Sequence, residues 1–527
     1  MIRSTRMRAI LFALLAFNAL SGQSQSSPSI PRFDATDVHT SAPALNPFTY
    51  ASGGFLRGNR YDLHKATLLD LISIAYQIAP ENVAGGPNWL EFERFDVAGR
   101  APADSSPETL RRMLQSLLAD RFHLSAHHDT RPMRAYVLAL GKAKPKLSEA
   151  TATGDAECRL VNASEGAPVM TFSCRNTSMA SLATRLRISA GDYLKEQVID
   201  NTGLEGAWDF TLRWTPRAPL LPEGGTRITV FQAVDRDLGL SLTLQDAPTP
   251  VLVIDGAEMP TPNAADLTQK LAPADQVFEV ASVKLDKNPQ SLPFRSTRTG
   301  LQVPSAPLKT VLGFAWDMNT AHTSRRFMGL PKGIDDIHVT IDARTTKASN
   351  PSRVEPTTGD DDLRAMTRAL LVERFRIQWH YEDRPMDAYS LVATNSKTKL
   401  KPADPSHRAS CEKARTMAND PRESNPWLNT VLSCRNVTLT EFAAKLQPLD
   451  DNLFVYPPED ATGIQGRFDF DLSFTAGRLA ESPEALQNGA IPLTEAINKQ
   501  LGIQLQERKR RLPAVIIDHM DLVPAEN

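Results

Sequence analysis

One stretch of this chain occurs twice, and that repetition limits the possible folds more than any other feature. Residues 117–136 read LLADRFHLSAHHDTRPMRAY, and residues 370–389 read LLVERFRIQWHYEDRPMDAY. Ten positions are identical between the two stretches at one constant offset. Self-similarity of this kind indicates that one folded unit is formed twice along the chain.

Further echoes follow in the same order along the sequence. Ser-Cys-Arg-Asn occurs at 173–176 and at 433–436, and a Thr-Gly turn sequence occurs at 200–206 and again at 460–466. A chain of 527 residues is in any case too long for one ordinary core. We therefore predict two homologous tandem domains, 30–263 and 276–527, joined by a polar linker at 264–275.

The N-terminus has the three parts of a secretory signal peptide. Arg3, Arg6 and Arg8 precede an apolar run at 9–20, and small residues follow it. A membrane span needs roughly 20 apolar residues, so this run is short for one, although an uncleaved anchor helix is the alternative. We expect a signal peptide at 1–24 and a periplasmic or extracellular mature protein. No later run is apolar enough to cross a bilayer, and a formal charge of −2 gives no general attraction to nucleic acid.

Local patterns predict an α+β fold. Apolar residues at helical spacing between 67 and 77 predict one helix, and Ser106 followed by Pro107 predicts the start of another. Strand-like alternation follows, and we interpret Asp129 to Pro132 as a tight turn before a returning strand at 135–140. Each domain is then expected to contain two strand-helix-hairpin halves with short mixed or antiparallel sheets.

The four cysteines fall as one pair in each domain. Cys158 and Cys174 belong to the first, and Cys411 and Cys434 belong to the second. In an exported chain this arrangement predicts one disulfide per domain. The alternative, four thiols around a metal ion, would need close spacings such as Cys-x-x-Cys, which the sequence lacks.

Several segments resemble a known family. They are Gly-Gly-Pro-Asn-Trp-Leu (85–90), Leu-Leu-Ala-Asp-Arg-Phe (117–122), Arg-Pro-Met-Arg-Ala-Tyr (131–136) and Asn-Thr-Gly-Leu-Glu-Gly (201–206). The chain is similar to an uncharacterised exported family, defined by a domain of unknown function and abundant in soil Acidobacteria. The second domain departs further from that pattern, because 328–333 lacks the tryptophan. The resemblance implies export and a shared fold, and it implies no activity. The strand-helix-hairpin pattern is also similar in shape to the small periplasmic domains of secretins and TonB-dependent receptors, which bind partners.

One constellation in each domain is a candidate for chemistry. Its members are His127, Arg131 and Tyr136 in the first domain and His380, Arg384 and Tyr389 in the second. A histidine beside an arginine can bind an anionic group or assist proton transfer. The structural alternative places the histidine on a solvated strand face, the arginine in a turn and the tyrosine in the sheet. We take these residues as a candidate binding surface.

The sequence gives weaker support to the other candidate sites. His123, His127 and His128 suit a metal ion, but their counterparts are Arg376, His380 and Tyr381, so one domain lacks the same ligands. Asp209 and Asp469 could act as paired carboxylates, yet strand alternation places them on a polar face. The common hydrolase, phosphate-binding and dinucleotide-binding motifs are missing. We therefore name no catalytic residue, and we expect neither a cofactor nor a metal.

Three functions remain open at this point. The leading hypothesis is a non-enzymatic tandem module that binds a protein or an envelope ligand, since two similar domains on one linker can raise avidity. The competing hypothesis is a cell-envelope hydrolase with a His/Arg/Tyr site in each domain. The third is a structural envelope protein.

Overall fold

The protein is described here from a computed structural model, which covers most of the chain. The described residues are 30–42, 51–150, 156–162, 169–191, 193–194, 196–216, 228–263, 271, 277–287, 294–297, 300–318, 320–344, 361–394, 398–414, 428–450, 453–477, 480 and 482–526. The predicted signal peptide at 1–24 lies outside them, as does the predicted linker at 264–275 apart from Leu271.

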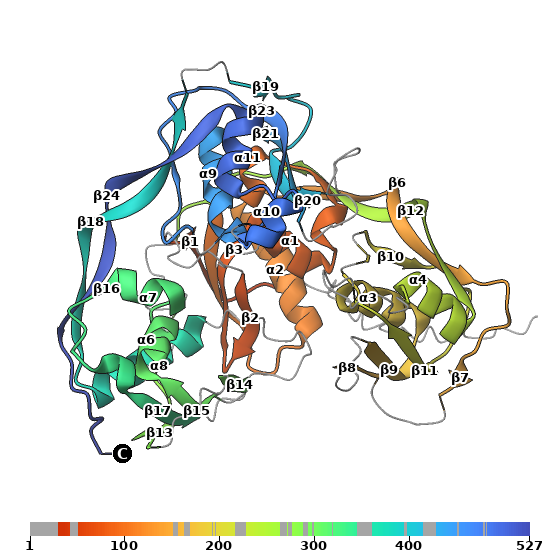
Figure 1. Ribbon diagram of the computed structural model, residues 1–527. Helices are drawn as coiled ribbons and strands as arrows, with labels where there is room; N and C mark the ends of the chain where they lie inside the picture. Colours follow the sequence, from red (N-terminus) through yellow and green to blue (C-terminus); the bar gives the residue numbers. More distant parts are fainter. Residues whose placement is uncertain are drawn as a thin grey trace, which may run out of the picture.

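The elements β1 to β12 form a first repeat of two lobes joined by a long two-stranded ribbon (Figure 1). The first N-lobe has the sheet β1-β5-β3-β2: Ala35–Thr40, Arg94–Arg100, Arg60–Thr67 and Ser52–Arg57. Its helical elements are α1 (Leu68–Tyr76), η1 (Pro80–Asn82), η2 (Asn88–Glu91) and α2 (Pro107–Arg121). The ribbon sheet is β10-β6-β12-β4: Val198–Asp200, Ser125–Leu140, Leu240–Gly256 and Val83–Gly85. The first C-lobe has the sheet β7-β11-β9-β8, with Ser148–Glu149, Trp208–Trp214, Met170–Thr177 and Glu157–Asn162, and the helical elements α3 (Met179–Ser189), α4 (Val230–Ala233) and η3 (Val234–Leu238).

The elements β13 to β24 form a second repeat with the same strand order in all three sheets. The second N-lobe has β13-β17-β15-β14: Val280–Leu285, His338–Arg344, Gly300–Pro307 and Arg295–Thr297. Its helical elements are α6 (Leu308–Ala315), α7 (Thr320–Arg326), η4 (Ile334–Asp336) and α8 (Asp361–Arg374). The second ribbon sheet is β22-β18-β24-β16: Glu459–Asp460, Gln378–Ala393, Ile503–His519 and Phe327–Met328. The second C-lobe has β19-β23-β21-β20 (Lys401–Pro402, Phe468–Phe474, Thr430–Val437, Ser410–Ala414), with α9 (Leu439–Leu446), η5 (Gln447–Leu449), α10 (Pro483–Gln487), α11 (Leu493–Ala496) and η7 (Ile497–Leu501).

The two helices expected from local patterns, at 67–77 and after Ser106, form as α1 and α2. In α1 the side chain of Thr67 accepts the backbone N–H of Asp70 and the Asp70 carboxylate accepts that of Thr67, which closes the helix N-terminus. The side chain of Ser106 accepts the N–H of Thr109 at the start of α2, as expected of an N-cap. Both helices bury their predicted apolar faces in the core of the first N-lobe. The chain is thus α+β, and no helix within its described part has the length and apolar character to span a membrane.

The predicted turn at Asp129 to Pro132 is wrong. β6 runs without interruption from Ser125 to Leu140 and pairs antiparallel with β12 over its whole length. β12 is likewise one strand rather than two, so the lobes are not strand-helix-hairpin halves. Each long strand instead contributes to both lobes: Leu252 and Ile254 lie in the N-lobe core, and Leu240 lies in the C-lobe core.

Prolines fit inside this ribbon because their nitrogens face its open edges. The N–H of Tyr136 donates to Gln197 O at 2.8 Å, away from β12, and the register is regular back to Pro132. Alternate residues share this direction, so the nitrogen of Pro132 also points outward, and no ladder hydrogen bond is lost. Pro250 lies opposite Thr130, in another pair whose backbone nitrogens point away from the partner strand. The second ribbon has the same arrangement at Pro385 and Pro513.

Both predicted disulfides are confirmed. Cys158 bonds to Cys174, and Cys411 bonds to Cys434. Each joins directly paired residues of two neighbouring strands, β8 with β9 and β20 with β21. In the chain-entropy account, a disulfide that closes a loop of this size raises the free energy of unfolding by about 3 kcal/mol.

The lobes of each repeat also touch beside the ribbon. In the first repeat the Nδ2 of Asn82 donates to Gln197 Oε1 at 3.3 Å, and Gln197 Nε2 donates to Thr249 at 3.1 Å. In the second repeat the guanidinium of Arg326 lies 4.4 Å from the ring centre of Tyr456. The junction of the first repeat thus has amide contacts and an ion pair between Arg187 and Glu81, whereas that of the second repeat has a cation–π contact.

Outward-facing prolines should protect the ribbon edges from pairing with other chains. We expect the double substitution Pro132→Thr and Pro250→Thr to leave the fold intact, because Thr suits a strand, but to expose two new N–H donors. The variant should then self-associate in a concentration-dependent way in light scattering. Pro107→Ala, at the first turn of α2, is the matched control. A variant as monodisperse as the control would contradict this role.

Candidate functional site

A histidine and an aspartate meet on the outer face of the first ribbon. Nδ1 of His127 on β6 lies 2.9 Å from Oδ2 of Asp255 on β12, so the ring N–H donates to the carboxylate. The two residues are 128 positions apart in sequence and come together only because β6 and β12 pair. The His127 side chain is 56% exposed, so the pair is reachable from solvent.

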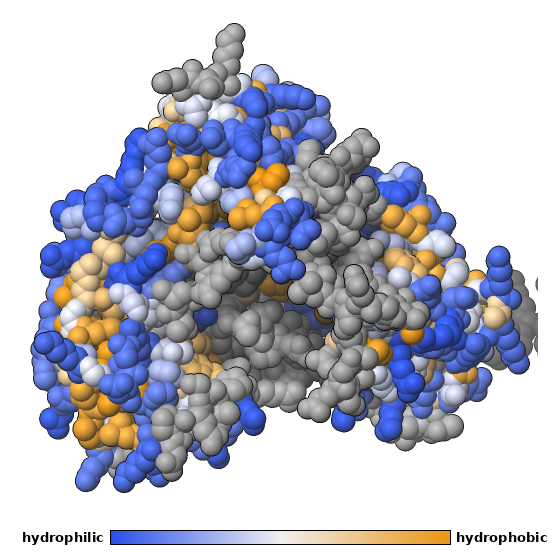
Figure 2. Space-filling model, in the orientation of Figure 1, coloured by the Kyte–Doolittle hydropathy of each residue, from blue (hydrophilic) through white to orange (hydrophobic). Residues whose placement is uncertain are grey.

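The second ribbon repeats this pair. Nδ1 of His380 lies 2.8 Å from Oδ2 of Asp518, and the His380 side chain is 49% exposed. Figure 2 shows hydrophilic side chains over the ribbon formed by β18 and β24. The same chemistry thus occupies the same place in both repeats.

An acidic residue and an arginine extend each pair along the strand. In the first repeat Arg131 Nε donates to Asp129 Oδ2 at 3.1 Å. In the second, Arg384 lies 2.8 Å from Glu382, whose carboxylate is 3.8 Å from Nε2 of His380. We call each set a charged row. The first row is Asp255, His127, Asp129 and Arg131, and the second row is Asp518, His380, Glu382 and Arg384.

The carboxylate of Asp129 is held in its ionised form. The backbone N–H of Thr130 donates to it at 2.7 Å, and the side chain of Arg131 donates as well. Together with the nearby charge of His127 when protonated, these contacts lower the pKa of Asp129 below its ordinary value. The first row therefore keeps this negative charge to a lower pH than an aspartate without these contacts would.

The two candidate tyrosines lie apart from the rows. Tyr136 is 8% exposed and its hydroxyl donates to Tyr193 O at 3.2 Å in the core of the first C-lobe. Tyr389 packs edge-on against Phe454 at 5.5 Å, and burial raises its pKa, with the charge of Glu507 adding to the rise. The structure brings the candidate histidine and arginine of each repeat together and places the tyrosine in a core.

The rows have part of a catalytic arrangement. A carboxylate on Nδ1 fixes the imidazole tautomer and leaves Nε2 as a base, as in a nucleophile–base–acid relay. In the described part of the chain, however, neither imidazole has a serine or cysteine within hydrogen-bonding distance. Both imidazoles are also half exposed, whereas general bases are usually tuned by burial.

The other candidates have local partners. His123 lies 3.0 Å from Glu258 and His127 lies 2.9 Å from Asp255, so these two histidines contact different carboxylates. Among the described residues no group of three histidine, cysteine or acidic side chains is placed to hold a metal ion. Asp209 accepts the backbone N–H of Asn176 at 2.8 Å, and Asp469 accepts that of Asn436 at 2.7 Å. Both asparagines have a positive φ, so these carboxylates stabilise a left-handed bend beside each disulfide.

Sequence reasoning did not find the acidic members of the rows. Asp255 and Asp518 are the last residues but one of β12 and β24, and Asp129 corresponds to Glu382 at the constant offset of the repeat. Comparing acidic positions between the repeats would have marked all four, because Asp255 and Asp518 are identical and Asp129 and Glu382 are both acidic. The pairing of Asp255 with His127 also requires the ribbon, which local patterns did not predict.

Arg131 should be the side chain that most affects the pKa of Asp129. We expect Arg131→Gln to raise that pKa, because one donated hydrogen bond and one positive charge are lost. Carboxyl carbon chemical shifts followed from pH 2 to 7, about the range in which aspartates titrate, would measure it. Arg134→Gln, which removes a guanidinium 3.9 Å from Asp246, is the control and should leave Asp129 unchanged. An unchanged pKa in Arg131→Gln would contradict the proposed geometry.

Comparison with known proteins identifies the repeat. A family model described as "Protein of unknown function (DUF3738)" matches residues 69–257 and again residues 309–520. No curated protein and no solved structure matches the chain. The two matches cover most of both repeats and more than half of the chain. The chain therefore belongs to the DUF3738 family, and it contains that domain twice.

Proposed function

We propose that this protein is exported, that its repeats arose by duplication, and that it is a non-enzymatic binding protein with one charged row on each repeat. The observation that carries the proposal is the recurrence of the same row on the same ribbon face, with His–Asp distances of 2.9 and 2.8 Å. Residues that only maintain a solvated surface have no need to keep such a pairing in both repeats. The two disulfides fit an oxidising compartment such as the periplasm or the extracellular space.

The exposure of the rows favours binding over catalysis. Half-exposed charges of both signs give specificity and fast association with a complementary surface. The outward prolines disfavour a partner that adds a strand to the ribbon edge, so recognition is by side chains on the face. The expected partner is a protein or an envelope ligand that carries charges of both signs.

Contacts between the repeats set the distance between the two rows. Lys65 of the first N-lobe lies 2.7 Å from Asp317 and 3.1 Å from Asp361 of the second N-lobe. The first N-lobe also contacts the second C-lobe through Glu91 and Arg408. A partner with two suitably spaced sites would engage both rows at once and gain avidity through a high effective concentration.

Removing the rows should abolish binding to the natural partner. We expect full-length protein to co-sediment with cell-envelope fractions of the producing organism, and the variant H127A/R131A/H380A/R384A to lose this. Variants lacking one row, H127A/R131A or H380A/R384A, should each bind roughly 100-fold more weakly if both rows engage one partner.

The control variant is H39A/R159A, which removes an exposed histidine and an exposed arginine outside the rows. It should co-sediment as the unaltered protein does. Equal co-sedimentation of the four-residue variant and this control would overturn the proposal.

A hydrolase is the second candidate, because a carboxylate holds Nδ1 of the histidine in both repeats. The binding proposal expects no hydrolysis of ester, amide or glycosidic substrates above the buffer rate. If the protein does hydrolyse one of them, the rate should be compared with H127A/H380A and with D255N/D518N. Loss of the rate in both variants would favour the hydrolase and contradict the non-enzymatic proposal.

A further inference from the structure

A loop of the first N-lobe is seated on the second C-lobe. We call residues 85–92 the docking loop; it contains η2 and the end of β4. The side-chain oxygen of Asn88 accepts the backbone N–H of Ala409 at 3.0 Å and the Nδ2 of Asn436 at 3.3 Å. The second C-lobe therefore binds this loop through the side chain of Asn88.

Two cations of the second C-lobe hold the rest of the loop. Arg408 pairs with Glu91 at 2.5 Å, with the two side chains 13% and 8% exposed. The other terminal nitrogen of Arg408 donates to Gly85 O at 2.9 Å and to Val83 O at 3.2 Å, and so covers the outer edge of β4. A charge pair this buried is costly to leave without its partner.

Lys445 of α9 makes the third contact. Its Nζ donates to Glu91 O at 3.3 Å and lies 4.8 Å from the ring centre of Phe92. Burial lowers the pKa of Lys445, and the carboxylate of Glu91 opposes that change. Phe92 itself packs against the core of the second C-lobe, so the loop adds an apolar contact to the polar ones.

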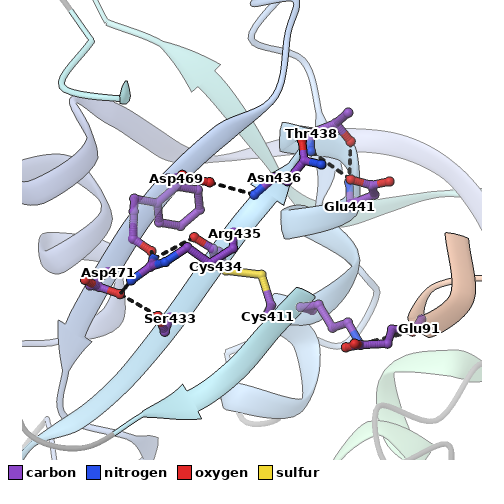
Figure 3. Close-up of a disulfide and its surroundings, with 12 residues drawn as sticks. Glu91, Cys411, Ser433, Cys434, Arg435, Asn436, Thr438, Glu441, Asp469 and Asp471 are labelled. Atoms are coloured by element: carbon purple, nitrogen blue, oxygen red, sulfur yellow. Dashed lines mark hydrogen bonds and ion pairs between the residues drawn. A yellow bond between two sulfur atoms is a disulfide. The ribbon is translucent and has the colours of Figure 1, made fainter. Parts of the chain in front are cut away.

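The contact surface on the second C-lobe lies beside a disulfide: Figure 3 shows Asn436 on the same strand as Cys434, with Cys411 bonded to Cys434 and Glu91 nearby. Ala409 directly precedes β20, which contains Cys411, and Asn436 lies two residues after Cys434 in β21. β20 is the edge strand of its sheet, and its strand neighbour is β21. The disulfide therefore helps to hold Arg408 and Ala409 near Asn436, whose Nδ2 also donates to His407 O at 2.6 Å.

We propose that the surface formed by Arg408, Ala409, Asn436 and Lys445 binds the docking loop only while the Cys411–Cys434 disulfide is formed. The thiol–disulfide state of the second C-lobe then decides whether the docking loop is seated on it, while the ion pairs of Lys65 with Asp317 and Asp361 still join the two N-lobes. A dithiol reductant breaks the S–S bond and supplies two electrons and two protons, and it becomes a disulfide itself. Without the crosslink, β20 is tied to β21 by its five-residue ladder and by the hydrogen bond from Asn436 Nδ2 to His407 O at 2.6 Å, and these alone do not hold Arg408 and Ala409 against the docking loop.

The first C-lobe provides a control within the same chain. Cys158 and Cys174 pair across β8 and β9 just as Cys411 and Cys434 pair across β20 and β21. The docking-loop contacts named above all go to the second C-lobe. Loss of the first disulfide should therefore weaken its own lobe without undocking the repeats.

The first experiment compares C411S/C434S with C158S/C174S in the full chain. Hydrogen exchange of residues 83–92 should be faster by roughly tenfold or more in C411S/C434S and unchanged in C158S/C174S, as expected for linked sites. Small-angle scattering should show a larger radius of gyration in the first variant alone. Unchanged exchange in C411S/C434S, or equal effects of both variants, would overturn the proposal.

The second experiment works in the opposite direction and leaves all four cysteines in place. Because coupling is reciprocal, undocking the loop should make Cys411–Cys434 easier to reduce. We expect E91R, which faces Arg408 with a like charge, to speed its reduction by dithiothreitol roughly tenfold, as measured by alkylation and mass spectrometry. Reduction of Cys158–Cys174 should not change.

The charge-swapped variant E91R/R408E separates docking from local damage. It restores an ion pair at the same place, so the slow reduction of Cys411–Cys434 should return. If E91R leaves the reduction rate unchanged, or if E91R/R408E reduces as fast as E91R, the proposed coupling does not exist. Neither result depends on what the charged rows bind.

Discussion

The antiparallel pairing of β6 with β12, and of β18 with β24, is the interaction on which each repeat depends. One end of each ribbon completes the core of an N-lobe, and the other end completes the core of a C-lobe. The lobes therefore share strands rather than only a connecting segment. The same pairing creates the charged rows, because it brings His127 to Asp255 and His380 to Asp518. Fold and candidate site thus depend on one set of long-range hydrogen bonds.

Local features were predictable from the sequence, and features that depend on distant strands were not. The helix at Leu68–Tyr76 and the cap at Ser106 follow from nearby residues, and both disulfides follow from the repeat and the cysteine count. Asp129 to Pro132 has the composition of a turn, and local propensity does not show that the nitrogen of Pro132 faces an open edge. In a continuous strand, successive side chains point to opposite faces of the sheet. Tyr136 is an odd number of residues away from His127 and Arg131, so its side chain must lie on the other face.

The two repeats share a strand order but not the surface at the docking loop. The docking loop has Gly-Gly-Pro-Asn-Trp-Leu in the first repeat, whereas the second has Gly-Leu-Pro-Lys-Gly-Ile at 329–334. Lys332 therefore stands where Asn88 makes its two contacts with the second C-lobe. Divergence at these positions makes the contact between repeats one-directional: the first N-lobe supplies the loop and the second C-lobe supplies the acceptor. The charged rows, in contrast, are kept in both repeats, which separates residues that join the halves from residues that face solvent.

The contact between Glu91 and Arg408 also has a consequence for the order of events during synthesis. The two residues are 317 positions apart, so the docking loop leaves the ribosome long before its acceptor. At about 5–20 residues per second, that interval is on the order of tens of seconds. During this time the outer edge of β4 and the ring of Phe92 have no partner from the second repeat. A first repeat that folds before the second C-lobe is available therefore has an open sheet edge at β4.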